Sequence, residues 1–389
     1  MKVKVGYSNN KDPFASSIET ATMANIKEAK LGLIFTSSNQ EQDRIIKGIK
    51  SLTNTPIIGC TSSRAISTNS GYMNDETGYT AMMTFFGDIT VAVAGKEKRD
   101  LEDAREIGRE IAEEALKEMK DVKPNYFFMT STPIDEEAYI EGIQDVIGEI
   151  PIFGGTAADN DVDGKWQIIC ENKVIKNGCA IALIHSDTDI KTICESSYNE
   201  TGQAGIVTGV IEKRTLKTID NIPALTKYAE WIGYNEDDLM GNRISTESIF
   251  HPLGVKDPIG RLITIRHPMI ANSDGSIKLG SNVETNTAII HMHMEPRDML
   301  ESIKTTIQEL GECDSYLIVQ SGFRRLGLEL NGLEQEINNK IKEVVKDKEF
   351  LLINTFGEYG INNHSANTVG ELSLSVTGFK EYKEVLWKV

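Results

Sequence analysis

The sequence lacks the short motifs that mark the most easily recognised enzymes and metalloproteins. It contains no P-loop, no Rossmann glycine fingerprint, no G-x-S-x-G nucleophile elbow and no H-E-x-x-H zinc motif. Its five cysteines are odd in number, and no two of them form a C-x-x-C pair of the zinc or redox type. We therefore expect a reducing compartment and none of the enzyme classes that those motifs define.

Long apolar runs and an excess of positive charge are also missing. No apolar run approaches the roughly 18 residues needed to cross a bilayer, and the opening MKVKVGYSNN lacks the apolar core of a signal peptide. The 41 Lys and Arg residues are outnumbered by 58 Asp and Glu residues, and the net charge of −17 repels phosphate backbones. We therefore expect a cytoplasmic protein with no membrane insertion and no nucleic-acid partner.

The composition is that of an ordinary folded protein. Hydrophobic residues make up 40% of the 389 residues and charged residues 25%, so neither disorder nor a fibrous repeat is expected. At roughly 150 residues a domain, this length predicts two or three domains.

The N-terminal half contains an internal repeat. The segments FTSS, IKGI and PIIGCT recur in the same order as MTST, IEGI and PIFGGT. Thr36 and Thr130, which occupy equivalent places, are 94 positions apart. Because self-similarity of this kind marks a duplicated structural unit, we predict two copies, over about 1–95 and 89–195.

Each copy has the alternating strand and helix signals of a β-α-β unit. Short apolar runs at 31–36 and 125–130 suit strands that are covered on both faces. Ser38 opens a capping box and Thr132 precedes a proline, so the next helices are predicted to begin there. The same β-α-β pattern occurs once more within 315–360.

These patterns predict an α/β protein. We expect an internally duplicated, pseudo-symmetric α/β N-terminal domain over 1–195, packed on a mixed α+β C-terminal domain over 196–389, where the elements become longer and looser. No low-complexity linker separates the two ranges, so the domains are expected to pack closely.

Two glycine turns, Gly59 to Arg64 and Gly154 to Asp159, are the candidate ligand site. Each follows a predicted strand, and ligands of open α/β sheets bind beyond the carboxyl ends of strands. Glycine permits close backbone approach, and Arg64 opposite Asp159 would suit a zwitterion such as an amino acid. The alternative is that the glycines only turn the chain and the two charges form a surface ion pair.

The C-terminal half is expected to close over these turns through HPLG, TIRHP and GEYG. The residues predicted to bind the ligand are Gly59, Cys60, Thr61, Ser62, Arg64, Gly154, Gly155, Thr156, Asp159, His251, Arg266, Glu358, Tyr359 and Asn367.

A haem or metal site is one alternative. His291 and His293 would project from one face of a strand, a spacing able to chelate a metal or to face a haem, with His251 or His267 as further candidates. A strand histidine is more often a core or surface residue and no third ligand stands nearby in the sequence, so we expect no cofactor.

An enzyme is the other alternative. Cys60 lies on a turn near a possible helix N-terminus and could act as a nucleophile with His251, His364 or Glu358. The second copy has Gly155 in the place of Cys60. A buried, inert Cys60 is the expected state, and no catalytic residue is assigned.

The motifs together resemble a known family. PIIGCTSS with FTSS upstream, then PIFGGTAADN, IDNIPAL, HPLG, and NTFGEYG followed by Asn367-Thr368 are similar to the FIST proteins, whose paired N- and C-terminal domains occur in bacterial and archaeal signal transduction. In relatives the first turn usually continues as small residue, glycine, glutamate, whereas this chain has Ser63-Arg64-Ala65.

The resemblance implies a sensory role. FIST proteins are thought to recognise small molecules, with amino acids a favoured suggestion, and some relatives are haem-based nitric oxide sensors. Because the two FIST-like halves use up the 389 residues, we expect a small-ligand sensor that signals through a separate protein such as a kinase or a chemotaxis component.

Overall fold

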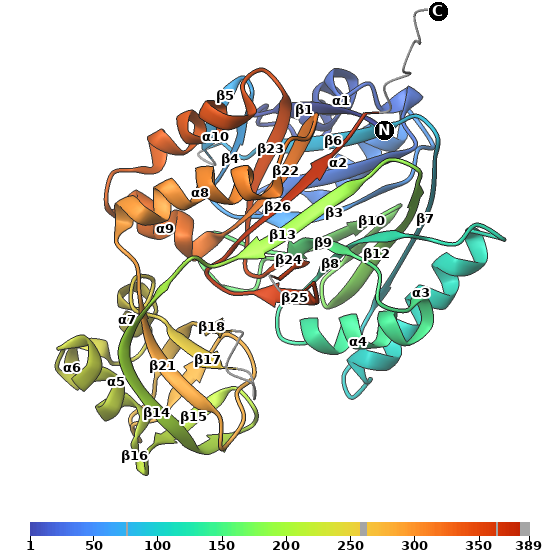
Figure 1. The fold of residues 1–389 in the computed structure, drawn as a ribbon. Helices are drawn as coiled ribbons and strands as arrows, with labels where there is room; N and C mark the ends of the chain where they lie inside the picture. Colours follow the sequence, from blue (N-terminus) through green and yellow to red (C-terminus); the bar gives the residue numbers. More distant parts are fainter. Residues whose placement is uncertain (75–76, 257–262, 363–364, 382–389) are drawn as a thin grey trace, which may run out of the picture.

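Three α/β units, each built in the same order, form the body of the protein (Figure 1). The computed structural model describes residues 1–74, 77–256, 263–362 and 365–381. The first unit contains β1 (Lys2–Ser8), α1 (Pro13–Met23), η1 (Ile26–Glu28), β2 (Leu31–Ser37), α2 (Gln42–Lys50), β3 (Ile57–Ser62), β4 (Ala65–Thr68), β5 (Gly71–Asn74) and β6 (Thr80–Phe86).

The second unit repeats this order and confirms the predicted duplication. It contains β7 (Ile89–Glu97), α3 (Ala104–Glu118), β8 (Tyr126–Ser131), α4 (Glu136–Ile147), β9 (Ile152–Thr156), β10 (Ile168–Cys170), β11 (Lys173–Ile175) and β12 (Gly178–Ser186). The helices begin later than the cap signals predicted. Ser37 and Ser131 end their strands in buried positions, and the next residues form turns before α2 and α4.

The third unit is split by an insertion. It contains β13 (Ile190–Glu195), α8 (Pro296–Leu310), β22 (Ser315–Ser321), α9 (Gly322–Leu330), η2 (Glu334–Glu336), α10 (Ile337–Val345), β23 (Glu349–Thr355), β24 (Glu358–Ile361), β25 (Asn367–Gly370) and β26 (Leu374–Phe379). Its sheet order β13-β26-β22-β23 matches β1-β6-β2-β3 and β7-β12-β8-β9. The body therefore has threefold internal pseudo-symmetry.

Each unit donates a hairpin to the sheet of another unit. The β10–β11 hairpin extends the first sheet at β3, with Cys60 opposite Ile168. The β24–β25 hairpin extends the second sheet at β9, with Gly155 opposite Glu358. The β4–β5 hairpin extends the third sheet at β23, with Ser67 opposite Leu352. Three six-stranded sheets result, and each depends on strands from two units.

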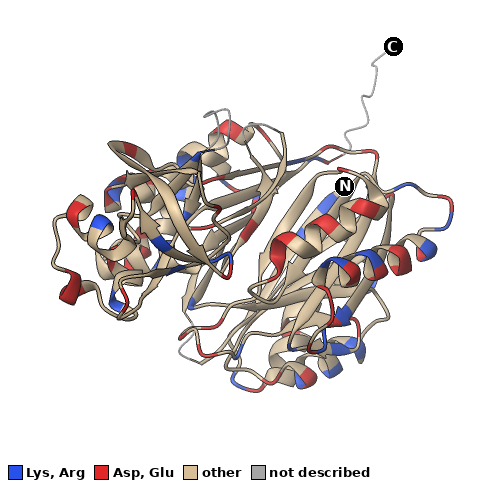
Figure 2. Ribbon diagram, turned by 90° about the horizontal axis from the view of Figure 1, so that it is seen from below, with Lys and Arg blue, Asp and Glu red and all other residues tan. Residues whose placement is uncertain are grey.

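The three sheets share one hydrophobic core. Phe35, Phe128, Phe153 and Phe379, which come from all three units, meet through edge-to-face contacts with centroid distances of 5.6 to 6.3 Å. The helices cover the outer faces of the sheets (Figure 1). Charged residues lie mainly along these helices and the loops, while the central strands carry few (Figure 2).

A separate, mostly antiparallel sheet forms the inserted domain, residues 199–293. Its elements are β14 (Asn199–Ile211), β15 (Thr215–Ile219), β16 (Ile222–Pro223), α5 (Ala224–Ile232), α6 (Glu236–Leu239), α7 (Arg243–Glu247), β17 (Leu253–Lys256), β18 (Ile263–Arg266), β19 (Pro268–Ala271), β20 (Ile277–Leu279) and β21 (Ala288–His293). It has a core of its own around Tyr228 and Leu253. None of the described helices is both long and apolar enough to cross a membrane.

The α/β class is confirmed. The predicted division into residues 1–195 and 196–389 differs from the grouping in the structure, where the body includes strands from both ranges. The first boundary coincides with the end of β13. Residues 296–379 nevertheless pack into the body, because β22, β23 and β26 bury Leu317, Leu351 and Phe379 against the first two units.

The inserted domain leaves and re-enters the body at adjacent points, because Asn199 pairs with His293. We predict that replacing residues 199–293 by a short glycine-rich linker leaves a body that unfolds cooperatively, at a lower temperature because contacts to β18 and β21 are lost. Residues 1–195 alone should not unfold cooperatively, since β9 and the β4–β5 hairpin lose their partner strands. Circular dichroism during heating checks both shortened proteins. Cooperative unfolding of residues 1–195 alone, or loss of cooperative unfolding when only 199–293 are replaced, contradicts the assignment of the body.

Candidate functional site

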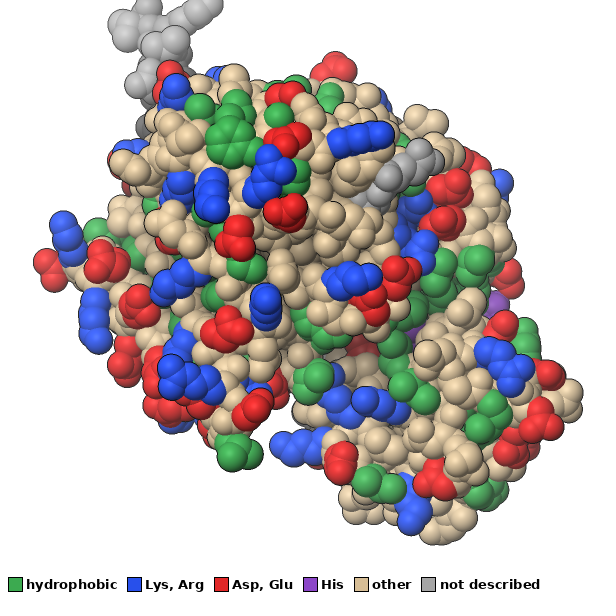
Figure 3. Space-filling model, turned by 180° about the vertical axis from the view of Figure 1, so that it is seen from behind, with side chains coloured by type: hydrophobic (Ala, Val, Ile, Leu, Met, Phe, Trp, Pro, Cys, Tyr) green, Lys and Arg blue, Asp and Glu red, His purple; other side chains and the backbone are tan. Residues whose placement is uncertain are grey.

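A cavity of about 130 Å³ lies where the second unit, the third unit and the inserted domain meet. The second unit contributes the start of α4 and the loop between β9 and β10, and the third unit contributes the turns after β22, β23 and β25. The inserted domain contributes Arg214, His267, Met269 and Ser281. Figure 3 shows hydrophobic side chains gathered along the junction between this domain and the body.

Parallel strand pairs position the body's share of this cavity. β8 pairs with β9, and β22 pairs with β23, so their carboxyl ends carry the adjoining segments to the same place. Glu136 follows β8, Trp166 follows β9, and Phe356 directly follows β23. The location agrees with the rule that ligands bind beyond the carboxyl ends of strands.

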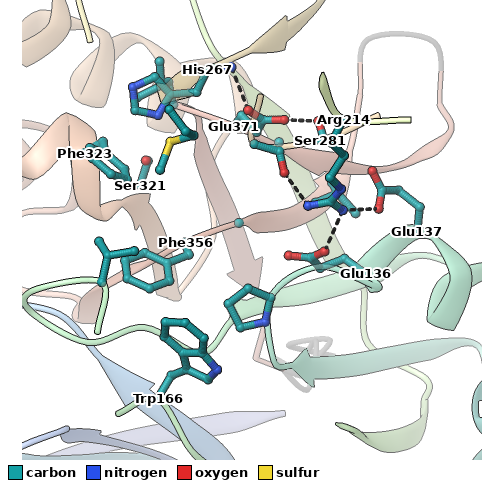
Figure 4. Close-up of a pocket in the computed structure, with 18 residues that line it drawn as sticks. Glu136, Glu137, Trp166, Arg214, His267, Ser281, Ser321, Phe323, Phe356 and Glu371 are labelled. Atoms are coloured by element: carbon teal, nitrogen blue, oxygen red, sulfur yellow. Dashed lines mark hydrogen bonds and ion pairs between the residues drawn. The ribbon is translucent and has the colours of Figure 1, made fainter. Parts of the chain in front are cut away.

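One side of the cavity is aromatic (Figure 4). Trp166 contacts Phe356 edge to face, with ring centroids 5.8 Å apart. Phe323, at the start of α9, contacts His267 in the same manner at 4.5 Å. Burial lowers the pKa of His267 to about 4, and its Nε2 lies 2.8 Å from the carbonyl oxygen of Ser245. His267 is therefore neutral at pH 7 and belongs to the apolar side.

The opposite side carries charged groups (Figure 4). Arg214 Nη2 lies 3.2 Å from Glu136 and 3.1 Å from Glu137, so one side chain of the inserted domain pairs with two carboxylates of the body. Its Nη1 donates to the carbonyl oxygen of Gly280. Burial raises the pKa of Glu136 to about 7, although the charge of Arg214 opposes the shift.

A third carboxylate, Glu371, follows β25. It is 8% exposed and accepts hydrogen bonds from the backbone N–H of His267, at 2.7 Å, and from the hydroxyl of Ser281. Burial raises the pKa of Glu371 to about 7. Both donors belong to the inserted domain, so this residue also joins that domain to the body.

Comparison with known protein families shows the family to which the chain belongs. A model of the FIST N domain matches residues 30–222, and a model of the FIST C domain matches residues 224–361. The chain belongs to the FIST family. FIST domains are associated with sensing in signal transduction, and the resemblance seen in the sequence motifs is confirmed.

An archaeal relative extends the comparison. An uncharacterized protein of Methanocaldococcus jannaschii is 26% identical to this FIST protein over 330 residues. The match covers 77% of this chain and 59% of the relative, so the chain spans less than two thirds of that protein's length.

In this FIST protein, the first glycine turn is part of strand β3. Gly59, Cys60, Thr61 and Ser62 are buried in the body, and Ser62 Oγ lies 2.6 Å from the hydroxyl of Tyr79. Burial raises the pKa of the Cys60 thiol to about 12, so the thiolate that nucleophilic attack requires is not populated at neutral pH.

The second glycine turn is part of β9 and is equally enclosed. A Cβ on Gly154, whose φ is +134°, would lie 2.0 Å from the carbonyl oxygen of Met129 in the neighbouring strand. Gly155 pairs with Glu358 across the exchanged hairpin. Thr156 Oγ1 lies 2.7 Å from the hydroxyl of Tyr359. Close approach of strands accounts for these glycines.

Arg64 and Asp159 both line a second cavity of about 260 Å³ beside the first. The two cavities share Val162, Phe323 and Phe356. Asp159 accepts backbone N–H groups of Val162 and Lys165 at 2.6 and 2.8 Å, which folds the loop that carries Trp166. Arg64 lies 3.2 Å from the exposed Glu329. That Arg64 and Asp159 bind a ligand stays a prediction, and the sequence did not single out Trp166, Arg214 or Glu371 of the first cavity.

The predicted residues of the C-terminal half have structural partners. Arg266 Nε donates to the carbonyl oxygen of Asn282 at 2.6 Å. Asn367 accepts from the N–H of Ile152 at 3.1 Å and donates to the carbonyl oxygen of Ile150, which ties the start of β25 to the start of β9. None of these side chains lines the first cavity.

Glu358 and Tyr359 are fully buried. Glu358 accepts from the hydroxyl and the N–H of Ser373, at 2.7 and 3.1 Å. Burial raises the pKa of Glu358 to about 8, and neighbouring Arg324 reduces the shift. The carboxyl group is thus protonated near neutral pH, and its hydrogen bonds to Ser373 lie inside the third unit.

Three histidines form a stack at one edge of the inserted domain. His251 lies between His291 and His293, with centroids 5.5 and 4.8 Å away, so the latter two share a strand face as predicted. Burial and the neighbouring His251 lower the pKa of His291 to about 4. Within the described residues, no three His, Cys, Asp or Glu side chains are arranged to hold a metal ion. His364, the other candidate, lies outside the described residues.

The buried thiols give a direct prediction. All five cysteines are free and buried, so we predict that the native FIST protein does not react with a thiol-specific disulfide reagent during minutes of incubation. Five thiols should react after unfolding in guanidinium chloride. A fast native reaction that Cys60→Ser abolishes would restore Cys60 as a nucleophile.

Glu358 predicts a pH dependence of stability. Its pKa is raised from an ordinary 4.5 to about 8 in the folded protein, so the folded state holds a proton that the unfolded state releases. Stability is full below the unfolded pKa and falls as pH rises through the folded pKa, by up to about 1.4 kcal/mol per pH unit. We predict that Glu358→Gln flattens this fall between about pH 5 and 8 in urea unfolding experiments. An unchanged slope would show that Glu358 is ionised at neutral pH.

Proposed function

We propose that this FIST protein is a cytoplasmic sensor whose first cavity binds an amino acid or a similar small polar metabolite. The observation that carries the proposal is the composition of that cavity. Aromatic groups of the body face carboxylates and an arginine, and the walls come from both the body and the inserted domain. A mostly apolar cavity with a few convergent polar groups is the usual form of a small-molecule site.

Binding would act on the junction between the inserted domain and the body. Arg214 joins the inserted domain to Glu136 and Glu137, and Glu371 accepts hydrogen bonds from His267 and Ser281. A ligand between these groups contacts both parts, so it favours the arrangement in which both contacts are made. The ligand therefore shifts the population of domain arrangements.

The signal would pass to a separate protein. FIST domains are associated with sensing in signal transduction, in which a sensor acts on other proteins. We therefore assign the output to a partner such as a kinase or a chemotaxis component. The net charge of −17 would steer a partner with a basic surface.

A haem or metal sensor is the second candidate, and the histidine stack supports it. His251 stacks against both His291 and His293, and His293 is half-buried while His291 is buried. Haem or a divalent metal that raises the unfolding temperature, and loses this effect in His291→Ala, would favour this candidate.

A thermal-shift screen against amino acids, short peptides, haem and divalent metals tests the proposal. A ligand that binds only the folded protein raises its unfolding temperature. For a ligand found in this way, we predict that Trp166→Ala lowers the affinity roughly tenfold or more, because an aromatic wall of the cavity is lost.

Arg64→Ala is the matched comparison, because Arg64 lines only the neighbouring cavity. It should leave the affinity within about twofold of the wild type, as surface substitutions away from a site usually do. Loss of binding in Arg64→Ala and Asp159→Ala, but not in Trp166→Ala, would place the ligand in the second cavity instead.

A further inference from the structure

The charges of the first cavity do not balance. Three carboxylates line it, from Glu136, Glu137 and Glu371, against the single guanidinium of Arg214. Arg214 is already engaged by the first two carboxylates and by the carbonyl oxygens of Gly280 and Ile134. Among the described residues, no basic side chain forms an ion pair with Glu371. The cavity therefore has a surplus of negative charge above about pH 7, where Glu136 and Glu371 are ionised.

Glu371 has room for another donor. A carboxylate offers about four acceptor positions, and Glu371 uses one on each oxygen, for Ser281 and for the His267 N–H. Both donors are neutral, while the residue is 8% exposed and lines the cavity. The charges of Arg266 and Arg214 act on Glu371, but neither forms an ion pair with it in the described part of the chain. A positively charged group in contact with this buried carboxylate therefore gains a strong, charge-assisted hydrogen bond.

The apolar side limits the size of what can enter. The cavity volume of about 130 Å³ is close to that of an engineered cavity of about 150 Å³ that holds benzene. Trp166, Phe323 and Phe356 supply the aromatic surface, and Met269 and Leu372 add aliphatic surface. One ring or a branched aliphatic group fills this space.

A free carboxylate on the ligand has no partner here. Arg214 is the cation of the cavity, and its guanidinium N–H groups already face Glu136 and Glu137. An added carboxylate would therefore lie near like charges in a partly buried site, which costs free energy. This distinguishes an amine from an amino acid.

We propose that the ligand is a small primary amine without a carboxylate, whose ammonium group binds Glu371 and whose apolar group packs against Trp166 and Phe356. The inference rests on the proposed function, because it names the ligand class of the same cavity. The amine contacts Glu371 of the body beside Ser281 and His267 of the inserted domain. Its binding therefore depends on the contact between the body and the inserted domain.

Isothermal titration with four matched probes tests the ligand class. The probes are 2-phenylethylamine, phenylalanine, 3-phenylpropionate and 2-phenylethanol, which share a phenyl ring and differ in charge. We expect the amine to bind at least about tenfold more tightly than phenylalanine, and the acid not to bind. Tighter binding of phenylalanine or of the acid overturns the proposal.

Glu371→Gln tests the residue. We expect the affinity for 2-phenylethylamine to fall about tenfold or more, and that for neutral 2-phenylethanol to stay within about twofold. Retained alcohol binding shows that the variant is folded with an intact cavity. Glu309→Gln, at an exposed position of α8, is the matched control and should bind the amine as the wild type does. Unchanged amine affinity in Glu371→Gln overturns the proposal.

The failure of this inference can be told from failure of the proposed function. If an amino acid binds, and Trp166→Ala but not Glu371→Gln weakens it, the sensor cavity stands and the amine proposal fails. If no amine, amino acid or other small metabolite binds, or if Trp166→Ala leaves every affinity unchanged, both fail.

Discussion

Exchange of hairpins among the three units is the constraint on which the rest of the structure depends. Each parallel strand pair ends in a turn that carries the chain out of its own sheet and onto the edge strand of another. No unit can complete its sheet alone, so the edges are covered and the aromatic core joins all three. The turns after β3, β9 and β23 are therefore fixed from both sides. The segments after β9 and β23 are held at the first cavity, and the segment after β3 is held at the second cavity.

This constraint explains why the glycine turns are structural. A turn between two sheets brings backbones close together, and a side chain on Gly154 would overlap the carbonyl oxygen of Met129. Of the hydroxyl groups at these ends, Thr156 bonds to Tyr359 and Ser62 bonds to Tyr79. Ser63 Oγ, in contrast, has no hydrogen-bond partner among the described residues, and Ser63 lines the second cavity. The groups left to face a ligand lie a few residues further along, where Asp159 folds the loop that carries Trp166.

Much of the body could be predicted from the sequence, because the first two units keep FTSS/MTST and PIIGCT/PIFGGT at equivalent places. The third unit was seen only as one more β-α-β pattern, since the inserted domain separates β13 from α8 and the matching segments, VQSG and INTFGE, have diverged. The first cavity could not be predicted, because Trp166, Arg214 and Glu371 come from three regions that only packing brings together. The Arg64–Asp159 neighbourhood was accessible because both residues follow repeated motifs.

Two buried carboxyl groups differ in what surrounds them, and the difference distinguishes the interior of the body from the candidate site. Burial raises the pKa of Glu358 to about 8 and that of Glu371 to about 7, yet only Glu371 lines the first cavity. Glu358 is enclosed by donors of its own unit, whereas both donors to Glu371 come from the inserted domain. Since apolar residues often stabilise a fold as well as buried charges do, ionisable groups kept at a cavity point to binding. If a ligand binds at Glu371 as proposed, a change in the charge of this residue would also alter the contacts that attach the inserted domain, and recognition would thereby be coupled to domain arrangement.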